Sequence, residues 1–154
     1  MSESQRKPLA PTLQESCWLP RSNRSPGIAR QLLRELLARM QDGERFTEHG
    51  ELVLSELVTN ALVHGTRRGQ LVRVSFEAGR DRLWIGVEDA DNRAPRLSPA
   101  PQGESGRGLL LVDQLSADWG WAPRQGLGKQ VWSVLAPAGG IPEQLPLSQS
   151  ALQR

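Results

Sequence analysis

Apolar residues recur along this chain with two different spacings, one helical and one alternating. The helical spacing, with apolar residues three or four positions apart, covers residues 26–41 and 47–64. Ser25 before Pro26 is typical of a helix start, and Ser25 is the expected N-cap. Gly65 can end the second helix in the left-handed C-cap conformation. Two long helices are therefore expected.

Alternation of apolar and polar residues predicts half-buried strands. These strands are expected over residues 16–19, 72–77, 83–88, 116–121 and 129–135. Residues 106–114 predict a short helix with a glycine-rich start. The resulting order, β-α-α-β-β-α-β-β, favours an α+β fold. We expect a two-layer α/β sandwich, with a mainly antiparallel sheet and helices on one face.

The ends of the chain differ in composition from its centre. Residues 1–14 and 137–154 are polar and contain prolines, and we expect both to be disordered tails around one domain, residues 15–136. The long proline-containing connection over residues 90–105 has no periodicity, which is typical of binding loops and covers. We expect it to form a mobile cover over a site.

Charge and cysteine content limit the possible partners and location. Nineteen basic and seventeen acidic residues give a formal charge of +2, and the basic residues form no run, which argues against nucleic-acid binding. The single cysteine, Cys17, excludes an intramolecular disulfide. No signal peptide and no apolar stretch of membrane-spanning length is present. We expect a cytoplasmic protein without direct contact to nucleic acid or membrane.

Two polar residues lie beside the apolar stripe of the second predicted helix. Glu56 and Asn60 are four residues apart, so both lie on one face of the helix, where they can meet a single ligand. Such a pair standing alone is more often solvated. Together with a later Asp89 and the later Gly106-Arg107-Gly108, it suggests a pocket for ATP and Mg²⁺.

Four segments, in this order, resemble the ATPase superfamily that includes gyrase, histidine kinases and MutL, whose fold is the Bergerat-type ATP-binding fold. They are ELVTNALVHG at 56–65 for the N box, DADN at 89–92 for a degenerate first glycine box, ESGRGL at 104–109 for the second, and GKQVW at 128–132 for the closing strand. The end of the N box and the short length resemble the anti-sigma-factor branch, the RsbW/SpoIIAB-like serine protein kinases. The resemblance covers roughly residues 20–135.

The resemblance implies a role at each matched position. Asn60 would be a ligand of Mg²⁺, and Glu56 would act as the general base on an attacking hydroxyl. Asp89 would accept a hydrogen bond from the adenine amino group. The remaining nucleotide contacts would come from Gly106, Arg107, Gly108, Leu109 and Lys129. For Lys129, contact with a phosphate and a position in solvent are both open.

The resemblance also implies partners. A protein of this branch would phosphorylate a STAS-type anti-anti-sigma partner, sequester a sigma factor and possess a second subunit in a homodimer. Asp91 and Arg93 stand where the first glycine box has glycines, so side chains occupy positions of close backbone approach. A catalytically inactive protein-docking module on the same fold is therefore the alternative. DNA binding is a weaker third hypothesis, since no helix-turn-helix pattern is present.

Overall fold

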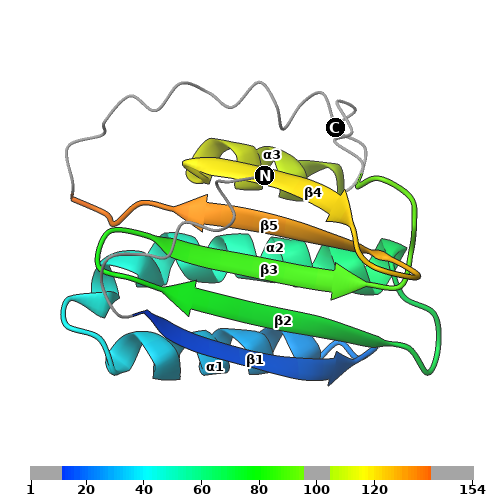
Figure 1. Ribbon diagram of the computed structural model, residues 1–154, viewed down its shortest axis with the longest axis horizontal. Coiled ribbons are helices and arrows are strands. Elements are labelled where there is room, and N and C mark those ends of the chain that lie inside the picture. Colours follow the sequence, from blue (N-terminus) through cyan, green and yellow to red (C-terminus); the bar gives the residue numbers. More distant parts are fainter. Residues whose placement is uncertain (1–11, 96–104, 140–154) are drawn as a thin grey trace.

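The computed structural model describes residues 12–95 and 105–139. Its sheet has the strand order β1-β2-β3-β5-β4, and all neighbours are antiparallel. The strands are β1 (Leu13–Pro20), β2 (Leu71–Ala78), β3 (Leu83–Asp89), β4 (Asp118–Pro123) and β5 (Lys129–Leu135). The helices are α1 (Ser25–Ala38), the 3₁₀ helix η2 (Gly43–Phe46), α2 (Thr47–His64) and α3 (Ser105–Leu115). The α-helices lie on one face of the sheet (Figure 1), so the predicted two-layer α+β sandwich is confirmed.

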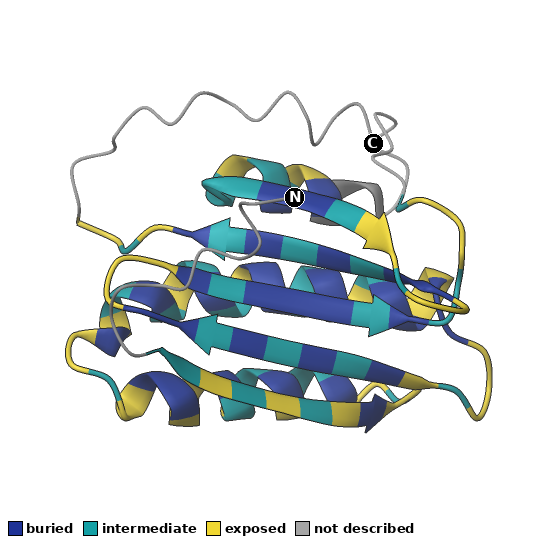
Figure 2. Ribbon diagram, viewed as in Figure 1, coloured by how far each residue is buried: buried dark blue, intermediate teal, exposed yellow. Residues whose placement is uncertain are grey.

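The core lies between the helices and the covered face of the sheet. Burial alternates along β2 and β5, as the striping in Figure 2 shows. The central part of α2 packs on this face with four side chains that are at most 2% exposed, namely Val53, Leu54, Leu57 and Val58. Burial of each such side chain contributes about 1.5–3 kcal/mol. These contacts hold α2 against the sheet and so position its C-terminal end.

Both expected helix caps are wrong in detail. Ser25 lies inside α1, with Arg24 at the N-cap position, and its buried hydroxyl group donates to the Pro20 carbonyl oxygen at 2.7 Å. Tertiary contact with the end of β1 has taken the hydroxyl group that a cap would use. Gly65 follows α2 with φ −110°, which is not left-handed. The left-handed conformation therefore does not explain the glycine at position 65. The close approach of the Asp89 side chain does, because a Cβ atom at position 65 would overlap its carboxylate.

The predicted chain ends are only partly described. β1 begins at Leu13, so the last two residues of the expected N-terminal tail belong to the sheet. The Ala138 amide donates to the Arg45 carbonyl oxygen at 2.9 Å, which ties the start of the expected C-terminal tail to η2. Residues 1–11, 96–104 and 140–154 lie outside the described part, so the remaining tail predictions and the mobile cover stay predictions. None of the described helices combines the length and apolar character that crossing a membrane requires.

Candidate functional site

A buried ion pair joins the end of β3 to the start of β5. Asp89 and Lys129 are directly opposite each other in the β3–β5 register. The Lys129 Nζ donates to Asp89 Oδ1 at 3.0 Å, and the two residues are only 5% and 2% exposed. Charged side chains are almost never buried unless they are paired. The alternative that Lys129 lies in solvent is therefore wrong.

The two carboxylate oxygens of Asp89 have different surroundings. Oδ1 also accepts a hydrogen bond from the Asp91 amide at 2.9 Å, whereas no group within residues 12–95 and 105–139 donates a hydrogen bond to Oδ2. Oδ2 lies against Gly65, where any Cβ atom would overlap the carboxylate. Burial raises the pKa of Asp89, and the Asp91 amide and Lys129 oppose this rise. The arrangement leaves one acceptor oxygen for a ligand.

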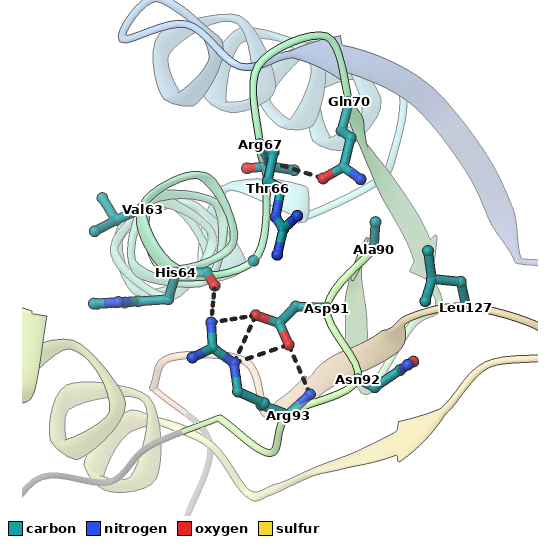
Figure 3. Close-up of a pocket in the computed structure, with 11 residues that line it drawn as sticks. Val63, His64, Thr66, Arg67, Gln70, Ala90, Asp91, Asn92, Arg93 and Leu127 are labelled. Atoms are coloured by element: carbon teal, nitrogen blue, oxygen red, sulfur yellow. Dashed lines mark hydrogen bonds and ion pairs between the residues drawn. The ribbon is translucent and has the colours of Figure 1, made fainter.

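A pocket of about 560 Å³ is lined by residues that adjoin this carboxylate, although Asp89 itself does not line it. The C-terminal end of α2, the segment that follows it, residues 90–93 and Leu127 line the pocket (Figure 3). Its size falls within the range of about 300–1,000 Å³ that is usual for small-molecule sites. Gly65 and Asp91, which flank the buried carboxylate, are both lining residues. A small ligand in this pocket would therefore lie next to Asp89.

Two hydrogen-bonded side chains fix the walls of the pocket. The Thr66 hydroxyl group lies 2.8 Å from the Ala61 carbonyl oxygen, an acceptor at the end of α2. Asn92 Oδ1 accepts a hydrogen bond from the Gly128 amide at 2.6 Å and so joins the loop after β3 to the turn before β5. Sequence reasoning missed this contact, because its two partners are 36 residues apart and no local pattern links them.

Asp91 and Arg93 form an ion pair of 2.6 Å at the pocket. Arg93 also reaches the His64 carbonyl oxygen at 3.5 Å and so connects the loop after β3 with the end of α2 (Figure 3). Hydrogen bonds from the Arg93 side chain and amide lower the pKa of Asp91 to about 2. The side chains of Asp91 and Arg93 therefore line the pocket at the two positions where the first glycine box of the resembling family has glycines.

The lowered pKa of Asp91 predicts a stability contribution that acid removes. Because the folded-state pKa lies below the unfolded value, the contribution is present above about pH 4 and is lost as the pH falls towards 2. Arg93 is 77% exposed, so solvent screening keeps the contribution small. We expect Asp91→Asn to be less stable than the wild type in urea unfolding at neutral pH, with a smaller difference at acidic pH. A difference that does not change with pH would contradict this assignment.

Glu56 and Asn60 are both half-buried on α2, as their spacing predicts. Neither residue lines the pocket, since the lining begins at Val63, about one turn after Asn60. In the described part of the chain, no group of three or more acidic, histidine or cysteine side chains could hold a metal ion. A lone amide oxygen is compatible with Mg²⁺, because this ion takes its other ligands from phosphates and water. The roles of both residues stay predictions.

The start of α3 contains the expected phosphate-binding residues. Gly106, Arg107 and Gly108 lie in its first turn, but their side chains are outside the described part. Leu109 is 1% exposed and belongs to the core, so its side chain stabilises the fold. α3 packs against α2, the helix that carries Glu56 and Asn60. The predicted contacts of these residues with nucleotide stay predictions.

Comparisons with known proteins agree with this arrangement. The family model described as a histidine kinase-like ATPase domain matches residues 20–134. The chain is also 39% identical over 72 residues to an uncharacterised protein of Streptomyces coelicolor, an alignment that covers 44% of this chain and 67% of that relative. The family match spans β2, β3 and β4 completely and β5 except for its last residue, whereas it includes only Pro20 of β1.

Proposed function

Because the chain belongs to the histidine kinase-like ATPase domain family, which implies ATP binding, we propose that it is an ATP-dependent regulatory protein kinase. It would phosphorylate a serine or threonine of a STAS-type anti-anti-sigma partner and sequester a sigma factor in the cytoplasm. The single observation that carries the nucleotide part of this proposal is the buried Asp89 carboxylate, which keeps one acceptor oxygen beside a pocket of nucleotide size.

The surroundings of Asp89 favour adenine as the base. An ionised carboxylate accepts the hydrogen bond that the exocyclic amino group of adenine donates, whereas guanine has a carbonyl oxygen at the same place. Lys129 stabilises the ionised form of Asp89. Backbone amides at the start of α3 would bind the phosphates, since the N-terminus of a helix favours anions.

α2 would supply the polar groups for phosphoryl transfer. Asn60 would hold Mg²⁺, which neutralises charge on the phosphates, and Glu56 would accept the proton of the attacking hydroxyl group. The bond between that oxygen and the γ-phosphorus forms while the bond to the β-phosphate oxygen breaks, and ADP leaves. One turn of helix separates the two residues, so both roles would be performed from one helix face.

Variants of α2 separate binding from chemistry. We expect Asn60→Ala to weaken Mg-ATP binding about tenfold or more in calorimetry, because a ligand of the ion is lost. Glu56→Gln should bind Mg-ATP like the wild type but transfer phosphate to the partner about a hundredfold more slowly, because the base is lost. Thr59→Ala, at an exposed position between them, is the matched control and should change neither quantity. Equal loss of binding in Asn60→Ala and Thr59→Ala would refute the assignment of Asn60.

The alternative function is a protein-docking module without catalysis. The Asp91–Arg93 ion pair favours it, because this pair and its contact with His64 occupy part of the pocket. In that case the wild type would bind no ATP at millimolar concentration and would still bind its protein partner. ATP binding by the wild type, combined with transfer that depends on Glu56, would exclude this alternative.

A further inference from the structure

The buried pair of Asp89 and Lys129 leaves hydrogen-bonding capacity unused on both side chains. The Lys129 ammonium group donates to Asp89 Oδ1 at 3.0 Å and to the Asp91 carbonyl oxygen at 3.3 Å. An ammonium group has three donor protons, so among the described residues one proton remains after these two contacts. Within the described residues, Asp89 Oδ2 also accepts no hydrogen bond. The ion pair therefore keeps one unused donor, on Lys129, and one unused acceptor, Asp89 Oδ2.

Asp89 and Lys129 do not themselves line the pocket, but residues in contact with both of them do. Gly65 lies against Asp89 Oδ2, and the Asp91 carbonyl oxygen lies beside the ammonium group of Lys129. Both Gly65 and Asp91 line the pocket. The absence of a side chain at position 65 leaves the carboxylate room at this wall, because a Cβ atom there would overlap it.

We propose that Lys129 is a specificity-determining residue that reads the adenine base together with Asp89. Asp89 Oδ2 accepts from the exocyclic amino group, and the remaining proton of Lys129 is donated to the adjacent ring nitrogen, which is an acceptor in adenine. Guanine carries a carbonyl oxygen and a protonated nitrogen at these two places, the reverse order. This inference rests on the proposed ATP binding and adds a direct base contact by Lys129.

A purely structural role of Lys129 is the competing explanation. In that case, the ammonium group only compensates the buried charge of Asp89, and the ring nitrogen of the base makes no contact with it. The two explanations differ in one measurable quantity. Only direct reading makes the affinity for nucleotide depend on the ring nitrogen, and only then does this dependence disappear with Lys129.

The test compares ATP with 1-deaza-ATP, in which a C–H group replaces this ring nitrogen. In calorimetry with Mg²⁺, we expect the wild type to bind the analogue about tenfold or more weakly, because a hydrogen bond from a charged donor is lost. Lys129→Met should bind ATP more weakly and bind the two nucleotides equally. Gln130→Met, on the opposite face of β5, is the matched control. It should retain the wild-type ratio of the affinities for ATP and 1-deaza-ATP.

Each result decides the question. Equal binding of both nucleotides by the wild type, or an unchanged ratio in Lys129→Met, overturns the role of Lys129 but leaves ATP binding in place. Absence of ATP binding by the wild type overturns the proposed function together with this inference. The wild-type comparison needs no variant, so it is decisive even where Lys129→Met does not fold. Lys129→Gln, which keeps a neutral donor beside Asp89, should retain a smaller preference for ATP over 1-deaza-ATP than the wild type.

Discussion

Replacing Gly65 with alanine is expected to lower the free energy of unfolding by about 2–4 kcal/mol and to weaken ATP binding at least about tenfold. The backbone of Gly65, with φ −110°, is open to alanine, so strain in φ is not the reason. The reason is steric, because the new Cβ atom would overlap the Asp89 carboxylate. Asp89 has little room to move, since Lys129 and the Asp91 amide both hold its Oδ1.

Two measurements check this prediction. Urea unfolding gives the loss of stability, and calorimetry on the folded fraction gives the affinity for Mg-ATP. Gly79→Ala is the matched control, because its Cβ atom would meet only ordinary contacts, the nearest at 3.4 Å from Thr12, and it should change both quantities little. Wild-type stability and affinity in Gly65→Ala would show that Asp89 is not held against α2 as the structure places it.

Replacing Gly128 with alanine is expected to destabilise the protein by about 3–5 kcal/mol, from backbone strain and a steric clash together. Gly128 has φ +110°, a conformation that residues with a Cβ atom rarely adopt. The added Cβ atom would also overlap the carbonyl oxygen of Asp89. That oxygen cannot retreat, because Asp89 is paired with Lys129 in the β3–β5 ladder.

The same turn offers a control that separates the two causes. Gly126 has φ +85° and open space around its Cβ position, so Gly126→Ala introduces strain without a clash. We expect it to destabilise by only about 1–2 kcal/mol in urea unfolding. Equal losses in Gly126→Ala and Gly128→Ala would indicate that the turn before β5 does not press on Asp89.

Both glycines show what motif reasoning missed about the construction of the candidate site. Gly65 ends the segment that resembles the N box, and Gly128 begins the segment that resembles the closing strand. Local rules suggested a left-handed helix cap for Gly65. The structure instead explains Gly65 by close approach to Asp89, whose position in the sequence is 24 residues later. Such a contact depends on how α2 packs across β3, and no local pattern records this packing.

The surroundings of Lys129 were also decided by the tertiary structure. As one polar residue at the start of a strand, it was compatible with solvent or with a phosphate. The β3–β5 register places it directly opposite Asp89, and the helices above the sheet bury both side chains. An isolated buried lysine would be unfavourable, so the pairing follows from the register together with the burial.

The sequence by itself determined the element types, their order, the two-layer α+β class and the candidate residues Glu56, Asn60 and Asp89. Periodicity carries the information on the elements, because each residue's polarity reflects which face of its own helix or strand is buried, whereas the roles of the candidate residues came from the resemblance to a known family. The tertiary structure alone decided the strand order, the pairing of Asp89 with Lys129 and the contact of Asn92 with Gly128. These features join segments that are far apart in sequence, and they depend on strand register and helix packing, which local polarity does not specify.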